Sequence, residues 1–244
     1  MSDLVSIIVP VYNERATLAA VIERLLTIDL PVPREIIVVN DGSRDGTREV
    51  LDELTARYPT LVVLHSNENR GKGHAVRLGF ARASGTIVAI QDADLELDPA
   101  QLSDLVMPVL ARATDVVYGS RFLSRVWTGS RLNHLANRFL TMMTNLLFGS
   151  SLTDMETCYK IMRTAIVRSL ELSSDRFEIE PEITAKLLLA GHHIVERPVS
   201  FSPRSRAAGK KIHWRDGLTA IRVLLHFRFQ GVRGVFRRKT PLTP

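Results

Sequence analysis

A pair of carboxylates separated by one small residue is the clearest candidate for chemistry in the sequence. Asp92 and Asp94 flank Ala93, and Glu96 follows two positions later. Carboxylate oxygens grouped in this way suit Mg²⁺ or Mn²⁺, because hard divalent cations prefer oxygen ligands and complete their shell with water or phosphate oxygens. A cation held there can bridge a diphosphate and neutralise the charge on a leaving group. The pattern therefore predicts a metal site at Asp92, Asp94 and Glu96, although such pairs are also common in solvated turns.

Further polar clusters each follow a short run of Val and Ile. The clusters are Tyr12–Glu14, Asp41–Gly46 and Gly119–Arg121. Asp41 stands directly at the end of its run, where a carboxylate can accept hydrogen bonds from a nucleobase. Asp45, Gly46 and Thr47 have a simpler interpretation as a tight turn and helix cap. The sequence holds neither a Walker A motif nor G-x-G-x-x-G, which removes the main support for a P-loop NTPase or a dinucleotide-dependent oxidoreductase.

The elements that must position these clusters alternate along the first half of the chain. Apolar runs rich in Val and Ile predict strands at Val5–Val11, Glu35–Asn40, Leu61–His65, Thr86–Gln91 and Asp115–Tyr118. Helical spacing occurs between them at Ala16–Ile28, Thr47–Tyr58, His74–Ala83 and Pro99–Ala111. This alternation predicts a Rossmann-like α/β fold with a mostly parallel central sheet flanked by helices. Because ligands of such sheets bind at the carboxyl ends of the strands, the polar clusters are expected along one edge.

Beyond Arg121 the pattern changes to predicted helices at Leu132–Phe148 and Pro181–Ala190, with one more strand at Ile194–Phe201. A chain of 244 residues is long enough for one large domain and an appendage. We expect a catalytic domain over residues 1–213, with halves at 1–121 and 122–213. Residues 214–244 are expected to form a basic, amphipathic, helical C-terminal segment.

Composition alone is ordinary for a globular protein, with 45% hydrophobic and 24% charged residues. The net charge of +6 is uneven: residues 203–244 hold 11 Lys and Arg against one acid, whereas residues 1–202 hold 21 against 25. A slightly acidic body argues against a nucleic-acid partner, which requires basic and aromatic residues across the body. The basic end instead favours attachment to an anionic membrane surface or recognition of phosphate.

The sequence predicts a cytoplasmic protein that meets a membrane only peripherally. Cys158 is the sole cysteine, the N-terminus lacks signal-peptide features, and no run approaches the roughly 20 apolar residues that span a bilayer. On an ideal helix, one sector of the C-terminal segment holds Leu218, Ile221, Leu225, Val232 and Phe236, and a neighbouring sector holds Arg215, Arg222, Arg233 and Arg237. Two interpretations use the apolar sector: the segment docks on a membrane interface, or it packs on the catalytic domain.

Five motifs occur in the order and spacing of a known enzyme family. They are Pro10–Glu14, Val39–Thr47, Asn69–Gly73, Gln91–Glu96 and Gly119–Phe122. These motifs resemble glycosyltransferase family 2, and most of all its dolichol-phosphate mannose synthase branch. The resemblance is dense in the first half and continues to about Trp214. It implies a GT-A fold, a divalent metal, and inverting transfer of a hexose from a nucleotide diphosphate sugar of the GDP-mannose or UDP-glucose type.

Carried over residue by residue, the resemblance assigns the nucleotide-sugar donor to the first half. The residues implied around the nucleotide are Pro10, Tyr12, Glu14, Asp41, Lys72, Asp92 and Ala93. Asp92 and Asp94 would hold the metal, whereas Glu96 stands where the mannose synthases commonly have Gln. Arg121 would approach the phosphates or the sugar, although an Arg after a strand is also commonly solvated. Lys72 would neutralise diphosphate charge or simply face water.

The second half is expected to bind the acceptor. Leu152–Lys160 resembles the family's acceptor-side segment, although Thr157–Lys160 departs from its usual sequence. Arg206, Lys210 and Lys211 resemble a loop that handles phosphates in the mannose synthases, with an imperfect match of the lysines and a solvated basic loop as the alternative. The acids Glu178 and Glu180 open a predicted helix, where the helix dipole alone favours carboxylates.

The acceptor decides whether the reaction needs a base. A polyprenyl phosphate is already anionic, so its attack requires only positioning and stabilisation of the diphosphate. A hydroxyl acceptor on a glycan, lipid or small molecule would lose its proton to a carboxylate, and Asp154 and Glu156 are the candidates. The resemblance and the basic end favour the phosphate. A catalytically silent sugar-nucleotide sensor is disfavoured because both metal carboxylates are present, and assembly into a homo-oligomer stays open.

Overall fold

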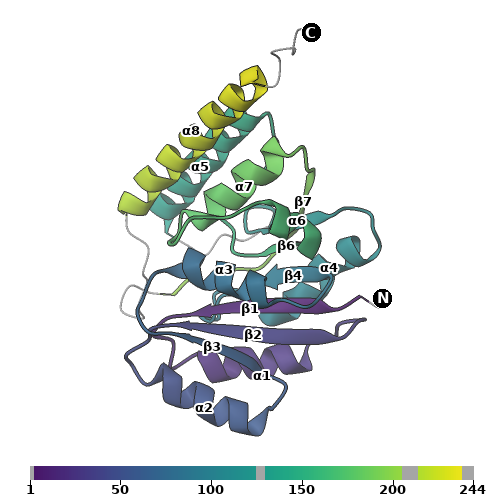
Figure 1. The fold of residues 1–244 in the computed structure, drawn as a ribbon, viewed down its shortest axis with the longest axis vertical. Coiled ribbons are helices and arrows are strands. Elements are labelled where there is room, and N and C mark those ends of the chain that lie inside the picture. Colours follow the sequence, from purple (N-terminus) through teal and green to yellow (C-terminus); the bar gives the residue numbers. More distant parts are fainter. Residues whose placement is uncertain (1–2, 125–129, 205–213, 238–244) are drawn as a thin grey trace, which may run out of the picture.

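The computed structural model describes residues 3–124, 130–204 and 214–237. Seven strands in this part of the chain form one sheet in the order β3-β2-β1-β4-β6-β5-β7 (Figure 1). The strands are β1 (Val5–Val11), β2 (Arg34–Asp41), β3 (Val62–Ser66), β4 (Ile87–Ile90), β5 (Val116–Ser120), β6 (Lys160–Arg163) and β7 (Ile194–Pro198). Neighbours are parallel except where β6 runs antiparallel between β4 and β5. The carboxyl ends of the other strands therefore share one edge.

Helices cover both faces of the sheet, which explains the apolar composition of its central strands. Ile7, Ile37 and Ile87 are fully buried on β1, β2 and β4. Helices α1 (Leu18–Thr27) and α2 (Thr47–Arg57) lie on one side of the sheet, and α3 (Lys72–Arg82) lies on the other (Figure 1). The short helix η1 (Pro99–Gln101) leads into α4 (Leu102–Leu110), which contacts β5 and β6.

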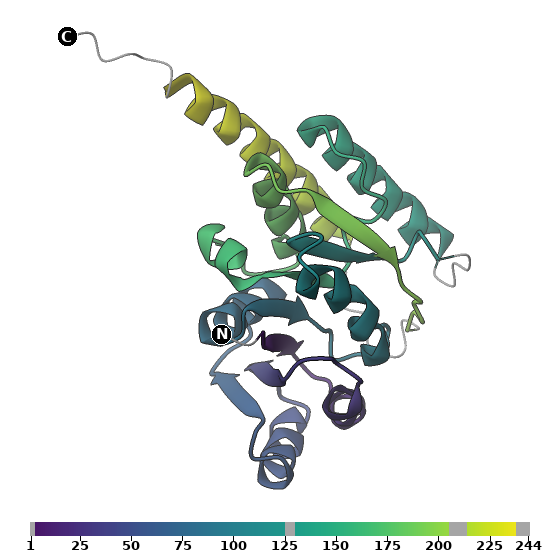
Figure 2. The ribbon, with the colours of Figure 1, turned by 90° about the vertical axis from the view of Figure 1, so that its right-hand side faces the viewer.

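Three long helices from the second half gather at one end of the molecule (Figures 1 and 2). They are α5 (Arg131–Phe148), α7 (Ile179–Leu189) and α8 (Trp214–Arg237). Ala220 and Leu224 of α8 are buried in a small core with Leu140 of α5 and Ala185 of α7. Helix α8 thus packs on the body of the protein, as one of the two sequence interpretations expects.

The structure confirms the α/β fold class and every strand and helix that the periodicity predicts, with shifts of a few residues at their ends. The strand predicted at Ile194–Phe201 ends at Pro198. Strand β6 and the adjoining short helix α6 (Thr164–Ser169) were not predicted. Strand β6 is only four residues long and begins with the buried Lys160, so its sequence KIMR lacks an apolar run. The division into domains at residue 213 remains a prediction.

Candidate active site

The loops that follow β1 and β2 are tied together by hydrogen bonds. The backbone N–H of Asn13 donates to Ser43 Oγ at 2.9 Å, and that of Arg44 donates to Asn13 Oδ1 at 2.8 Å. Asn13 has a positive φ of 51°, a conformation that Asn tolerates better than most residues. The Glu14 N–H donates to Thr47 Oγ1 at 3.0 Å, at the start of α2. The predicted nucleoside-binding segment is therefore held rigidly against its neighbour.

Asp41, at the end of β2, fixes the loop before α3. Its carboxylate accepts hydrogen bonds from Asn69 Nδ2 at 2.9 Å, from the Arg70 N–H at 3.1 Å and from the Gly71 N–H at 2.6 Å. Gly42 allows this close approach, because a Cβ there would lie 2.5 Å from the carbonyl carbon of Glu68. Asp41 thus anchors the loop before α3, and its contact with a nucleobase remains a prediction. Asp45 has the predicted turn role, since it accepts from the Thr47 N–H at 3.0 Å.

Beneath the end of β4, Lys72 bridges two carboxylates. Its Nζ lies 2.8 Å from Asp92 Oδ1 and 2.9 Å from Glu180 Oε1. Burial opposes the charge of Lys72, but the two carboxylates outweigh it and raise the pKa of this lysine well above its ordinary value. Burial likewise opposes ionisation of Asp92, yet Lys72 keeps its pKa below the ordinary value. Of the two roles expected for Lys72, the water-facing one is wrong.

Glu180 also binds a second buried lysine. Lys160 Nζ lies 2.5 Å from Glu180 Oε2 and donates to the carbonyl oxygen of Met155 at 3.1 Å. Glu180 stands in the first turn of α7, where the helix dipole favours it, but its burial between Lys72 and Lys160 gives it a further role. It joins the acidic end of β4 to the second half of the chain.

Asp94 lies in a second acidic group, together with Glu14 and Glu96. Arg204 joins all three: its guanidinium donates to both oxygens of Glu14, at 2.8 and 3.0 Å, and to Asp94 Oδ2 at 3.1 Å. Its backbone N–H donates to Glu96 Oε1 at 2.8 Å. Burial and the negative charges of Asp92 and Glu96 raise the pKa of Asp94 to about 7, against the opposing effect of Arg204. Ala93 ties this loop to α1, because its carbonyl accepts from Thr17 Oγ1 at 2.7 Å.

These carboxylates fit a cation that is shared with a phosphate ligand. Within residues 3–124, 130–204 and 214–237, no three His, Cys, Asp or Glu side chains form a group that could hold a metal ion. Asp92 forms an ion pair with Lys72, whereas nearby positive charge does not compensate ionised Asp94, whose pKa is raised. Mg²⁺ is usually bound by only one or two carboxylates, with substrate phosphates and water completing its shell. Asp94, assisted by Glu96, meets this requirement.

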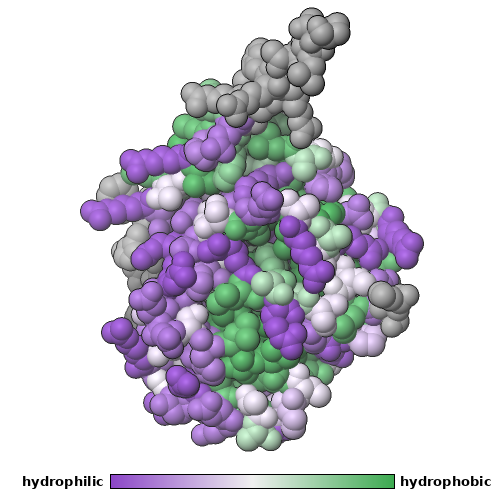
Figure 3. Space-filling model, viewed as in Figure 1, coloured by the Kyte–Doolittle hydropathy of each residue, from purple (hydrophilic) through white to green (hydrophobic). Residues whose placement is uncertain are grey.

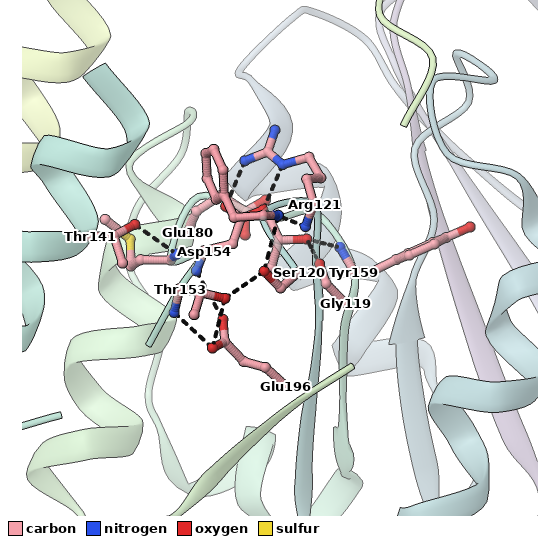
Figure 4. A network of polar contacts seen from close by, with 12 residues as sticks. Gly119, Ser120, Arg121, Thr141, Thr153, Asp154, Tyr159, Glu180 and Glu196 are labelled. Carbon is pink, nitrogen blue, oxygen red and sulfur yellow. Dashed lines mark hydrogen bonds and ion pairs between the residues drawn. The ribbon is translucent and has the colours of Figure 1, made fainter. Parts of the chain in front are cut away.

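At the end of β5, Arg121 and Asp154 form a buried ion pair (Figure 4). Arg121 Nε and Nη2 each donate to the Asp154 carboxylate at 2.7 Å, and the Arg121 N–H adds a bond of 3.0 Å. Glu196 of β7 holds the same loop, accepting from the Thr153 N–H at 2.7 Å and the Asp154 N–H at 2.9 Å. Arg121 is therefore a fixed cation at the end of β5, and its solvated interpretation is wrong.

Glu156 differs from Asp154 in having spare acceptor capacity. Asp154 is fully buried and uses both oxygens on Arg121. Glu156 Oε1 is buried and has no hydrogen-bond partner in the described part of the chain. Burial, together with the negative charges of Glu180 and Asp154, raises the pKa of Glu156 to about 7, while Lys160 and Arg121 lower it. Of these two acids, Glu156 has the properties of a proton acceptor near neutral pH.

The structure brings most of the predicted site residues to one edge of the sheet. Pro10 lies in β1, and Tyr12 and Glu14 follow this strand; Asp92 and Asp94 follow β4, and Arg121 follows β5. Arg206, Lys210 and Lys211 lie outside the described residues. Sequence reasoning missed Arg204 and Lys160, since a single basic residue in a loop or a strand carries no pattern. Arg204 is the first residue of the segment 204–211 that resembles the phosphate loop, but the match assigned phosphate contacts to Arg206, Lys210 and Lys211 and none to Arg204.

The fold and this edge define an α/β protein whose ionisable side chains gather at the carboxyl ends of its parallel strands. Residues 6–170 match the family described as Glycosyl transferase family 2. A dolichol-phosphate mannosyltransferase from Pyrococcus furiosus is 30% identical over 84% of this chain and 58% of its own length. An undecaprenyl-phosphate mannosyltransferase from Micrococcus luteus is 30% identical over 93% of this chain and 96% of its own length. The chain belongs to glycosyltransferase family 2 and is a glycosyltransferase.

Solved structures support the GT-A fold. Glucosyl-3-phosphoglycerate synthase from Mycobacterium tuberculosis, in complex with Mn²⁺, UDP and glucosyl-3-phosphoglycerate, aligns with a TM-score of 0.71 and 19% identity over 93% of this chain and 80% of that one. A second structure of that enzyme contains Mg²⁺ and UDP and aligns with a TM-score of 0.67. Among the described residues of this chain, none of the helices combines the length and apolar character needed to cross a membrane.

Proposed function

We propose that the protein transfers a hexose, with inversion, from a nucleotide diphosphate sugar of the GDP-mannose or UDP-glucose type to a polyprenyl phosphate. The observation that carries the proposal is the acidic group at the end of β4, in which Arg204 contacts Asp94 and Glu96 while Lys72 binds the adjacent Asp92. Such a group suits a donor whose diphosphate is bound through a divalent cation. The names of the relatives from P. furiosus and M. luteus support a polyprenyl phosphate acceptor.

Asp94 and Glu96 are the residues proposed to hold Mg²⁺ or Mn²⁺. The ion, when bound, supplies positive charge that stabilises the departing diphosphate. Lys72 lies 2.8 Å from Asp92 and keeps this carboxylate ionised at the edge of the site. Arg121, held by Asp154, offers a preorganised guanidinium to a phosphate or a sugar oxygen. The acceptor phosphate is anionic at neutral pH, so these residues orient it without removing a proton.

A hydroxyl acceptor is the second candidate, and the state of Glu156 favours it specifically. This side chain combines an unpartnered buried oxygen with a pKa of about 7, as a general base requires. Asp154 is the weaker of the two candidate bases, because its carboxylate is already bound by Arg121 through two side-chain hydrogen bonds.

A matrix of donors and acceptors tests the proposal. Purified protein is incubated with GDP-mannose, UDP-glucose and related donors, each with a polyprenyl phosphate or the corresponding free polyprenol, in Mn²⁺, Mg²⁺ or EDTA. We expect a glycolipid product only with the phosphate and only with a metal. Product from the free alcohol, lost in Glu156→Gln, would support the hydroxyl acceptor instead.

We further propose that α5 and α8 dock on an anionic membrane surface, where a polyprenyl acceptor resides. Helix α8 turns Ala220 and Leu224 inward, so its packing leaves Leu218 and Phe229 exposed. Helix α5 has an outward apolar stripe with alternating spacings of three and four residues, comprising Leu132, Leu135, Phe139, Met142 and Leu146. Leu132 and Leu146 are 72% and 77% exposed. Figure 3 shows apolar surface in the region of these helices, beside strongly hydrophilic side chains.

The charges on these helices favour lipid as the partner. Helix α5 contains Arg131 and Arg138 and no acid, and α8 contains Asp216 as its one acid. Each basic residue near an anionic surface adds about 1 kcal/mol of attraction, and exposed Leu and Phe can enter the headgroup boundary. Docking of a second copy on the stripe is the alternative, and it would give a homo-oligomer in the absence of lipid.

Sedimentation with phosphatidylglycerol vesicles at low salt tests membrane docking. Changing Leu135, Phe139 and Leu146 to Gln is expected to reduce binding, and so is changing Arg222, Arg233, Arg237 and Arg238 to Gln, with little change in melting temperature. The solvent-exposed pair Arg48 and Glu49 of α2, changed to Gln, is the control. Undiminished vesicle binding by both sets of variants contradicts docking, and a lipid-free dimer that dissociates in the α5 variant identifies the second copy as the partner.

A further inference from the structure

Arg204 contacts the acidic edge through both its side chain and its backbone. Its guanidinium binds both Glu14 oxygens, at 2.8 and 3.0 Å, and one of the same nitrogens lies 3.1 Å from Asp94 Oδ2. The contacts connect the loop after β1 to the loop after β4. One arginine therefore holds a carboxylate that we propose as a metal ligand.

The charges around Arg204 do not balance. Its side chain and backbone contact three carboxylates, those of Glu14, Asp94 and Glu96, while Arg204 supplies one positive charge. When all three carboxylates are ionised, two negative charges are left, which is the charge that one divalent cation neutralises. Arg204 thus compensates the group only partly, and it binds a carboxylate that we propose as a ligand of the cation.

The two partners of the guanidinium are not equivalent. Glu14 is buried, binds Arg204 through two hydrogen bonds and is itself held by Thr17 Oγ1 at 2.9 Å. Asp94 receives one bond, which is also the longest of the three. The hydrogen bond from Arg204 to Asp94 can therefore break while the two hydrogen bonds to Glu14 hold Arg204 in the site. Its Nε is buried without a hydrogen-bond partner in the described part of the chain, so the guanidinium has a donor left for a further acceptor.

We propose that Arg204 couples metal binding to nucleotide binding. Without nucleotide, Arg204 competes with the cation for Asp94 and weakens metal binding. A bound diphosphate gives the guanidinium, including its free Nε–H, another anionic partner, and Asp94 is released to the cation. By linkage, nucleotide and metal then strengthen each other's binding by the same factor. This inference rests on the proposed metal role of Asp94 and adds that the site stays weak for metal until the diphosphate arrives.

Direct titration of Mn²⁺, followed by electron paramagnetic resonance with and without UDP or GDP, tests the coupling. Arg204→Gln removes the charge and keeps a polar side chain. We expect this variant to bind Mn²⁺ about tenfold more tightly than wild type in the absence of nucleotide, and the enhancement by nucleotide to shrink by a similar factor. Arg204→Lys keeps the charge but loses the two-pronged grip on Glu14. It is expected to bind free Mn²⁺ no more tightly than wild type.

Arg24→Gln is the matched control, because Arg24 forms an exposed ion pair of 3.8 Å with Asp98, four residues beyond Asp94. It removes the same charge from the same region and should leave both Mn²⁺ affinities within twofold of wild type. Equal Mn²⁺ affinity in Arg204→Gln and wild type, or equal tightening in Arg24→Gln, overturns the coupling. If Asp94→Asn binds Mn²⁺ as well as wild type does, the proposed metal site itself is wrong, so the two failures are distinguishable.

Discussion

The raised pKa of Asp94 predicts that this carboxylate destabilises the metal-free protein at neutral and alkaline pH. Its pKa is about 7, against an ordinary value of 3.8, because the side chain is buried beside Asp92 and Glu96. The folded chain keeps a proton on Asp94 that the unfolded chain releases above about pH 4. The contribution of this proton to the free energy of unfolding is complete below pH 3.8, the ordinary pKa, and is lost as the pH rises through about 7. Asp94→Asn, which is neutral throughout, should escape the loss.

The size of the effect follows from the two pKa values. About three pKa units, at about 1.36 kcal/mol each, set an upper limit of about 4 kcal/mol. Part of this is already lost at pH 5, so the change between pH 5 and pH 8 is smaller than the limit. We therefore expect the stability of Asp94→Asn relative to wild type to rise by about 2 kcal/mol between pH 5 and pH 8. In a protein of this size that corresponds to about 4–8 °C in Tm.

Thermal unfolding in EDTA, followed by circular dichroism at pH 5, 6, 7 and 8, measures this difference. Asp92→Asn is the control with the opposite sign, because Lys72 lowers the pKa of Asp92 and the ion pair stabilises the fold. That variant should be less stable than wild type at every pH in the series. A pH-independent difference between Asp94→Asn and wild type, or a loss of stability that grows toward pH 8, would refute the reasoning about Asp94.

Three other substitutions test the account of the site. Glu156→Gln should retain transfer to a polyprenyl phosphate within about threefold, because an anionic nucleophile needs no base; loss of turnover with unchanged binding of both substrates would contradict this. Glu180→Gln leaves Lys72 and Lys160 buried with less negative charge and should lower the free energy of unfolding by about 3 kcal/mol in urea denaturation. Gly42→Ala should lower the free energy of unfolding by more than about 1 kcal/mol, because φ is positive and a Cβ would overlap the next loop. Gly191→Ala is the control, since Gly191 also has a positive φ but lies in open space, and it should lower the free energy of unfolding by less. Equal losses in the two variants would contradict the packing argument.

Much of the fold could be predicted because the parallel sheet has a simple sequence pattern. Strands buried on both faces need continuous Val and Ile, and β1 was predicted at its observed bounds, Val5–Val11. Strand β6 shows the limit of the pattern. It begins with Lys160, whose ammonium is neutralised by Glu180 from a distant helix, so a charged residue occupies a buried strand. Periodicity cannot register a partner that only the tertiary fold supplies.

The site could be predicted only as far as its position and its acidic residues. Asp92 and Asp94 stand at the carboxyl end of β4, as the strand-and-loop pattern indicates. Their chemical difference could not be read from the sequence, since Lys72 neutralises Asp92 while Asp94 shares Arg204 with Glu14. These contacts join residues up to 190 positions apart. The electrostatics of the site are therefore properties of the folded chain.

We propose that a sugar is transferred to a polyprenyl phosphate with a metal ion bound at Asp94. The most direct measurement is mass spectrometry of the lipid after incubation of the purified protein with donor, polyprenyl phosphate and Mn²⁺. We predict a new species heavier than the acceptor by one hexose unit, lost in EDTA, restored by Mn²⁺, and reduced at least about a hundredfold in Asp94→Asn, as expected for loss of a group that stabilises the transition state. An unchanged yield of that species from Asp94→Asn, or in EDTA, would contradict the account.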